Sequence, residues 1–125
     1  MMDDPRHRFI HGDICDSNTV TRAIKGIDVV VNLAAETHVD RSISSDTHFI
    51  RSNVVGAATL LAGALDSDVQ RFIQVSTDEV YGELPWVDPE NRDSSDTPRF
   101  TEETPLSPRS PYSATKAAAD HLTLA

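Results

Sequence analysis

Tyr112 and Lys116 are the residues whose types and spacing most directly suggest chemistry. Four residues apart on a helix, they project from one face. A tyrosine phenol titrates near ~10 in water and is a poor base at neutral pH, but a neighbouring ammonium favours the phenolate. Such a phenolate can take the proton of a substrate hydroxyl while hydride leaves for a nicotinamide ring. Alone, the Tyr-x-x-x-Lys pattern is a weak signal, because helices contain it by chance.

The segment Ser76-Thr77-Asp78-Glu79 follows an apolar run and places two hydroxyls and two adjacent carboxylates at a predicted strand end. Neighbouring carboxyl groups tend to have separated pKa values, so one can act as a general acid and the other as a base. Elimination of water across a carbon–carbon bond needs that division. A solvated start of a loop or helix explains Asp78 and Glu79 equally well on local grounds. The hydroxyls at this strand end make the tyrosine–lysine pair a much stronger signal.

Asp13 and Ile14 follow the first predicted strand, and open α/β sheets bind ligands beyond the carboxyl ends of their strands. The Asp13 carboxylate can accept a hydrogen bond from an adenine amino group, with Ile14 against the ring. A turn or capping role for Asp13 is the alternative.

After the second predicted strand, Ala34 and Ala35 are small side chains where a backbone must approach something closely. Residues 36–42 are then polar or charged, except Val39. No second His or Cys stands at metal-ligand spacing from His38, so we predict no metal.

Strands and helices are expected to alternate along most of the chain. Strands are predicted for residues 8–12, 27–35 and 71–76, the second of them covered on both faces of a parallel sheet. Helices are predicted from a cap at Asp16, Ser17 or Asn18 to Gly26, from about Asp46 to Leu65, and from Pro111 or Tyr112 onward. The order β, α, β, α, β indicates an α/β fold with a doubly wound parallel sheet.

The chain between the last predicted strand and the last helix has a different composition. Six of the seven prolines fall between Pro85 and Pro111. We expect an exposed acidic loop at about 85–99 and assign it no role. The 125 residues suffice for one modest core, which predicts a single domain over 1–125.

The overall charge of the chain disfavours partners that are themselves anionic. Eleven Lys and Arg against twenty Asp and Glu give a formal charge of −9, which disfavours nucleic acid and anionic membranes. Residues 1–125 contain no apolar run long enough to cross a bilayer, and the lone Cys15 cannot form an internal disulfide. A cytoplasmic protein is expected.

Several segments together resemble the dTDP-glucose 4,6-dehydratases, which are extended short-chain dehydrogenases. The resemblance rests on residues 12–16, 34–42, 76–82, 100–105 and 110–116, so it spans nearly the whole chain. Thr-Asp-Glu-Val-Tyr-Gly at 77–82 is its most specific mark. It implies a Rossmann-like domain that binds NAD and a nucleotide-sugar substrate.

The resemblance also implies roles for the candidate catalytic residues. Tyr112 would take the proton from the hydroxyl on carbon 4 of the glucose while bound NAD accepts the hydride, with Lys116 at the nicotinamide ribose and Thr77 bonded to the same sugar oxygen. Glu79 would remove the proton at carbon 5, and Asp78 would protonate the hydroxyl that leaves carbon 6. Return of the hydride to carbon 6 would give dTDP-4-keto-6-deoxyglucose.

The cofactor-binding residues implied by the resemblance come from four parts of the chain. They are Asp13, Ile14, Leu33, Ala34, Ala35, Glu36, Thr37, Ser52, Tyr112 and Lys116, and Thr37 and Thr77 would also face the substrate.

The sequence departs from this family in lacking the turn Gly-x-x-Gly-x-x-Gly, because its five glycines are isolated. We therefore expect a central fragment: a partial doubly wound sheet without the first βα unit and the C-terminal substrate part. In the strand order 3-2-1-4-5-6, residues 8–12 and 27–35 would be strands three and four, which do not pair directly. The edge of residues 27–34 would then be unpaired. A homodimer is expected for a full-length family member.

Two other functions stay open. Another nucleotide-sugar epimerase or decarboxylase of the same superfamily would share Tyr112 and Lys116 but would not need Asp78 and Glu79 to expel water. A truncated, non-catalytic chain is the second.

Overall fold

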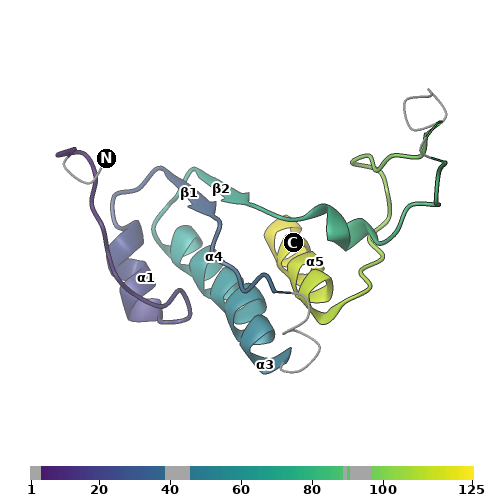
Figure 1. Cartoon of the computed structure of the whole chain (residues 1–125). Coiled ribbons are helices and arrows are strands. Elements are labelled where there is room, and N and C mark those ends of the chain that lie inside the picture. Colours follow the sequence, from purple (N-terminus) through teal and green to yellow (C-terminus); the bar gives the residue numbers. More distant parts are fainter. Residues whose placement is uncertain (1–3, 39–45, 89, 91–96) are drawn as a thin grey trace.

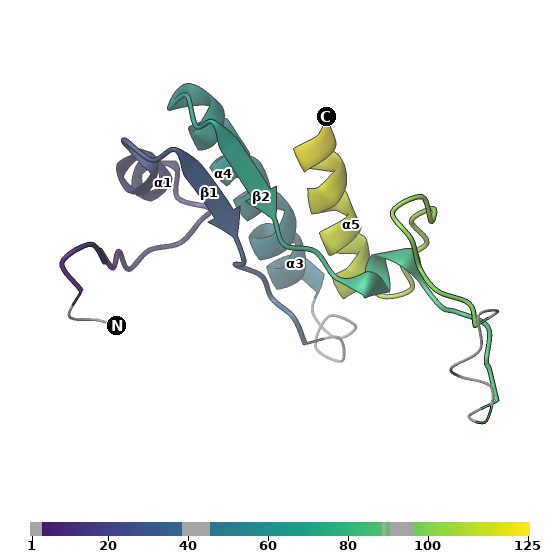
Figure 2. The ribbon, with the colours of Figure 1, turned by 90° about the horizontal axis from the view of Figure 1, so that it is seen from above.

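The computed structural model describes residues 4–38, 46–88, 90 and 97–125. Strands β1 (Val29–Asn32) and β2 (Arg71–Gln74) form a parallel sheet. The helices are α1 (Ser17–Ile24), α3 (Asp46–Phe49), the π-helix η1 (Ile50–Val55), α4 (Gly56–Asp66), the 3₁₀-helix η2 (Asp78–Tyr81) and α5 (Pro111–Leu124). Figures 1 and 2 show α1 and α4 on one face of the sheet and α5 beside the chain that leaves β2. The arrangement is a partial α/β fold with a parallel sheet, as predicted.

The two strands are covered on one face by the described elements. Val29 and Val31 are 47% and 49% exposed, whereas Asn32 on the opposite face is buried. The prediction that residues 27–35 form a strand covered on both faces is therefore wrong for the described chain. Its apolar side chains alternate between a face that packs on helices and a face that does not.

Residues 8–12 were predicted as a strand, and this prediction is also wrong. Among the described residues the sheet has two strands, and neither is paired with this segment. Phe9 is accordingly exposed. A strand needs a hydrogen-bonded neighbour, and the expected strand order leaves residues 8–12 out of contact with residues 27–35.

Helix α1 begins and ends at residues that the sequence predicted. Its N-cap is Asp16, whose carboxylate accepts hydrogen bonds from Asn18 N at 3.1 Å and Thr19 Oγ1 at 2.6 Å. Gly26 follows the helix with φ of 74°, a conformation that favours glycine. The buried Val20 and Ile24 face α4 across Gly63, where an added Cβ would lie 2.7 Å from Val20.

The helix predicted from about Asp46 to Leu65 is confirmed, with one difference in its middle. The elements α3, η1 and α4 follow one another without a break. Phe49 and Ala57 are buried on its inner face, as the apolar spacing predicted. The π-helical turn was not predicted, because an apolar pattern does not distinguish one wide turn from regular α-helix.

Asn53, inside the π-helix, joins three segments that are far apart in the sequence. It is 3% exposed, and its Oδ1 accepts a hydrogen bond from Glu36 N at 2.8 Å. Its Nδ2 donates to Glu36 O at 3.1 Å and to Thr115 Oγ1 at 2.9 Å. Thr115 in turn donates to Tyr112 O at 2.7 Å. One amide group therefore holds the loop after β1, the π-helix and the first turns of α5 together.

The turn after β2 ends at Gly82, which has φ of 91°. Gly82 N donates to Glu79 O at 3.2 Å, and Ser107 N donates to Val80 O at 2.9 Å, so the returning chain is bound to this turn. A Cβ added at Gly82 would lie 2.5 Å from the Ser107 carbonyl oxygen. Glycine is required here by both conformation and space.

The predicted loop at 85–99 is described only in part. Residues 89 and 91–96 lie outside the described chain, as do residues 39–42 of the polar segment after β1. Trp86 and Asp88 are exposed, which agrees with an exposed loop over the residues that are described. No helix in the described residues is both long and apolar enough to span a membrane.

Replacing Asn53→Ala is expected to destabilise the protein by about 1–3 kcal/mol, because the Glu36 backbone and Thr115 lose a buried partner. Urea denaturation followed by circular dichroism measures the change. The exposed Asn18→Ala on α1 is the matched control. Equal denaturation midpoints for the two variants would contradict the role given to Asn53.

Replacing Gly82→Ala is expected to cost more stability than Gly26→Ala. Both glycines have positive φ, but an added Cβ at Gly26 meets nothing within 4 Å, whereas at Gly82 it meets backbone. The strain of an alanine at positive φ costs about 1 kcal/mol of stability at either position, and the contact with Ser107 adds to this cost at Gly82. Thermal melts of the two variants test the difference, and a Gly82→Ala melt at or above that of Gly26→Ala would count against the close approach.

Candidate active site

The turn that follows β2 carries three of the predicted catalytic side chains. Thr77 is extended and caps η2, with its Oγ1 accepting a hydrogen bond from Glu79 N at 3.3 Å. The same hydroxyl donates to Asp78 Oδ1 at 3.4 Å. Asp78 and Glu79 are both exposed, so each carboxyl group is open to exchange protons with a ligand or with water.

Helix α5 carries the other two. It begins with a capping box between Ser110 and Ser113 and with proline at its first position, which explains why the chain becomes helical here. Tyr112 in the first turn is buried, and its ring meets Phe49 edge to face, with centroids 6.5 Å apart. Its position is therefore set by the long helix as well as by α5.

Lys116 lies one turn after Tyr112 and is only 4% exposed. Its Nζ donates to the Val75 carbonyl oxygen at 2.5 Å. Burial lowers the pKa of this lysine, and the nearby Asp120 carboxylate offsets part of that effect. The contact brings the middle of α5 to a point two residues before Thr77.

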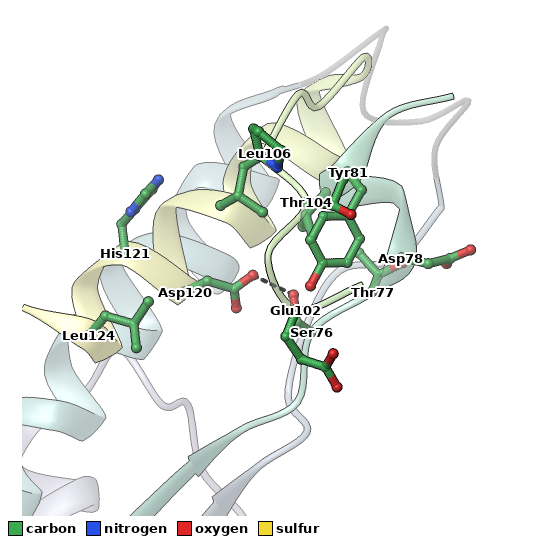
Figure 3. A pocket seen from close by; sticks show the side chains of 12 residues that line it. Ser76, Thr77, Asp78, Tyr81, Glu102, Thr104, Leu106, Asp120, His121 and Leu124 are labelled. Carbon is green, nitrogen blue, oxygen red and sulfur yellow. Dashed lines mark hydrogen bonds between the residues drawn. The ribbon is translucent and has the colours of Figure 1, made fainter. Parts of the chain in front are cut away.

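Two cavities are lined by part of the predicted site residues. Thr77 and Asp78 line a cavity of about 730 Å³ between the turn after β2 and the outer part of α5 (Figure 3). Glu79, Tyr112 and Lys116 are not among the described residues that line it. The five predicted catalytic residues thus lie on two touching elements without sharing one cavity.

The second hollow, of about 370 Å³, collects most of the predicted cofactor-binding residues. Its lining is Gly12, Asp13, Ile14, Ala34, Ala35, Glu36 and Ser52. The segment before α1, the chain that follows β1 and the π-helix therefore meet at one place. Leu33 and Thr37 are exposed and lie outside this lining, and Tyr112 and Lys116 belong to the neighbouring element α5.

Asp13 is held in place at this hollow by two contacts. Its Oδ1 accepts a hydrogen bond from Cys15 N at 2.8 Å, and its Oδ2 lies 2.8 Å from an Arg51 guanidinium nitrogen. The Cys15 backbone N–H and then Arg51 lower the pKa of this carboxyl group. Asp13 is therefore an ionised hydrogen-bond acceptor at neutral pH.

The structure adds three residues that the sequence reasoning missed. Asn53 stands four residues after Phe49 and four before Ala57, so a polar side chain at a core position of an amphipathic helix was the available signal. Asp120 follows Lys116 by one helical turn, and this spacing of opposite charges was a weaker signal that the two residues interact. Arg51 had none, because its partner Asp13 is remote in the sequence. The described residues contain no group of His, Cys, Asp or Glu placed to hold a metal ion.

Several known proteins are similar to this chain in sequence and structure. The chain is 52% identical over 121 residues to the low-salt glycan biosynthesis protein Agl12 of Haloferax volcanii, covering 97% of this chain and 36% of that protein. It is 48% identical over 131 residues to dTDP-glucose 4,6-dehydratase 1 of Escherichia coli K12, covering 96% and 36%. A crystal structure of a double mutant of the Streptomyces venezuelae dTDP-glucose 4,6-dehydratase DesIV, with NAD and DAU bound, matches with a TM-score of 0.84 and 44% identity, covering 97% and 34%.

The chain spans about a third of the length of the curated relatives that it matches. These relatives confirm the resemblance predicted from the motifs at 12–16, 34–42 and 76–82. The sequence model of the GDP-mannose 4,6 dehydratase family matches residues 1–125, which is the whole chain. This chain is therefore a member of the GDP-mannose 4,6 dehydratase family.

Proposed function

We propose that these residues belong to an NAD-dependent nucleotide-sugar dehydratase that converts dTDP-glucose to dTDP-4-keto-6-deoxyglucose with loss of water. Residues 1–125 would form one partial Rossmann-like domain that supplies the acid–base groups and part of the cofactor site. The homodimer expected for a full-length family member remains part of this proposal.

The observation that carries the proposal is the contact between Lys116 and the end of β2. A lysine that is 4% exposed and bonded to the Val75 carbonyl keeps a cation beside the strand end that leads to Thr77. Burying an ammonium costs free energy, so its retention points to a functional use. Here the proposed use is to hold the nicotinamide ribose, one helical turn after Tyr112.

The proton steps follow from the chemistry of the side chains. Tyr112 as phenolate accepts the proton of the hydroxyl on carbon 4, while Thr77 donates a hydrogen bond to the same oxygen. The new ketone acidifies the proton on carbon 5, which Glu79 removes and later returns to carbon 5, once carbon 6 has received the hydride. Asp78 protonates the hydroxyl on carbon 6, which leaves as water. The exposed, adjacent carboxyl groups on η2 can exchange these protons.

The hollow at the end of β1 fits the adenosine part of NAD. Asp13 is an ionised acceptor for the adenine amino group, Ile14 is apolar, and Ala34 and Ala35 leave room for close approach of the backbone. Bound at this site, NAD would supply reversible hydride transfer, taking the hydride from carbon 4 and giving it back to carbon 6. Leu33, Glu36, Thr37 and Ser52 are proposed to line the rest of this site, with Lys116 at the ribose.

The double variant Asp78→Asn, Glu79→Gln tests the proposal against an epimerase. A dehydratase should lose at least ~10²-fold in formation of the dehydrated product, since both proton-transfer groups are gone. An epimerase reaction at carbon 4 should continue. Turnover is measured by the loss of one water in the mass of the sugar nucleotide, using this chain in place of the matching segment of the Escherichia coli enzyme.

Two controls separate binding from chemistry in that experiment. Glu83→Gln with Asp88→Asn removes two exposed carboxylates downstream of the turn and should leave turnover unchanged. Titration of the 125-residue chain with NAD should raise its melting temperature in the wild type and the double variant alike. Absence of both stabilisation by NAD and turnover would favour the non-catalytic alternative.

Lys116→Met is expected to raise stability while it abolishes turnover. Burial lowers the pKa of Lys116, so the unfolded chain binds this proton more tightly than the folded chain does. Between the two pKa values, wild-type stability therefore rises with pH. The variant should melt above the wild type at neutral pH, and the gap should narrow as the pH is raised through the lysine's range. Thermal melts over a pH series test this.

The exposed Lys25→Met is the matched control for that series, since Lys25 is the only other lysine of the sequence. A gap between Lys116→Met and the wild type that does not change with pH would show that the lysine's burial is not its cause.

A further inference from the structure

The end of β2 is bound twice by helix α5. Lys116 Nζ donates to the Val75 carbonyl oxygen at 2.5 Å, and Ser76 Oγ donates to Asp120 Oδ2 at 2.5 Å. Figure 3 shows Asp120 and Ser76 pointing toward each other from α5 and from the strand end. Because Lys116 and Asp120 are four residues apart, both bonds come from one face of the helix. Two consecutive residues of the strand end are thus fixed to two consecutive turns of α5.

The fixed dipeptide directly precedes the turn with the candidate acid and base. Ser76 is bonded to Thr77, whose hydroxyl caps η2. Any movement of Ser76 away from α5 would therefore move Thr77 and the carboxylates that follow it. The proposed roles of Tyr112, Thr77 and Glu79 need one substrate held between α5 and this turn, so the distance between the two elements matters.

Asp120 is also the charge that acts on Lys116. The elements packed against α5 carry other ionisable groups, namely His48 on α3, Arg51 on η1, Asp66 on α4, Arg71 on β2, and Asp78, Glu79 and Tyr81 on η2. Among the described residues, Asp120 is the one that counters the desolvation of the lysine. Its carboxylate therefore acts on the site in two ways, through the hydrogen bond from Ser76 and through the effect of its charge on Lys116.

We propose that Asp120 is a positioning residue, which fixes the strand end at Ser76 against α5 and serves as the counter-charge of Lys116. Its effect on turnover rests on the proposed function. Its effect on Lys116 does not, because the charge acts in this chain whatever reaction the protein catalyses. The two can therefore be tested separately.

The test is the titration of Lys116 in the full 125-residue chain, followed by NMR of lysine labelled with ¹³C at the ε carbon. With two lysines in the sequence, the exposed Lys25 provides an internal reference in every sample. Asp120→Asn keeps an acceptor for Ser76 but removes the charge. Asp120→Glu keeps the charge, and Ser76→Ala removes the hydrogen bond but leaves the carboxylate.

We expect the titration midpoint of Lys116 to fall in Asp120→Asn and to stay near the wild-type value in Asp120→Glu. The titration curve of Lys25 should be the same in both variants. Ser76→Ala should lower the Lys116 midpoint less than Asp120→Asn does, because the charge remains. An unchanged midpoint in Asp120→Asn overturns the proposal. An equal fall in all three variants also overturns it, since that would reflect general disturbance of the helix.

Loss of the fold would give a different result, because exposing Lys116 to water moves its midpoint upward. If Asp120→Asn behaves in that way, the wild-type chain provides the decisive measurement. The Lys116 ε carbon should then show an inflection at the pH where the Asp120 carboxyl carbon titrates. Independent inflections would refute the counter-charge role.

Turnover is then measured in the Escherichia coli enzyme that carries this chain in place of its own matching segment. There, Asp120→Asn should shift the pH profile of turnover more than it changes KM, and Asp120→Glu should restore the profile. Shifted lysine titration with an unchanged profile would leave Asp120 as the counter-charge but reject the proposed function of Lys116. An unshifted titration would reject the role of Asp120 itself.

Discussion

The hydrogen bonds of the Asn53 amide are the constraint on which the rest of the site depends. Asn53 satisfies both backbone groups of Glu36, beyond β1, and reaches Thr115, in the helix that carries Tyr112 and Lys116. A buried amide with every contact made fixes position more narrowly than apolar packing does, since hydrogen bonds are directional. The hollow at the end of β1 and the candidate catalytic helix are therefore set by the same side chain.

The burial of Lys116 costs stability, and the proposed reaction uses the charge that is kept there. A methionine of similar size would pack among its neighbours without desolvating a cation, yet the chain keeps an ammonium that is 4% exposed. Such conflicts between local stability and local composition are typical of functional sites. The cost is reduced by the Val75 carbonyl oxygen and the Asp120 carboxylate, so the cation is not left without partners.

Helix ends were predictable from the sequence, because they depend on local features. Asp16 caps α1, Pro111 is the first residue of α5, and the apolar spacing from Asp46 located the long helix. Strand partners were less predictable, since pairing is decided by residues remote in the sequence, and residues 8–12 show this. The positions of Asn53 and Asp120 depend on contacts between elements, which no local pattern encodes.

The π-helix at Ile50–Val55 places one extra residue in the middle of the long helix. A π turn accommodates one residue more than an α turn, and each α-helical residue advances the chain by about 100° around the axis. Deleting a single residue from the wide turn would therefore let regular α-helix form while the segments before and after it keep nearly the same relative orientation. Deleting a residue from α4, which has no extra residue, would rotate the segments on its two sides by about 100° against each other. A one-residue deletion that spares Asn53 should therefore disturb the fold less within Ile50–Val55 than within Gly56–Asp66.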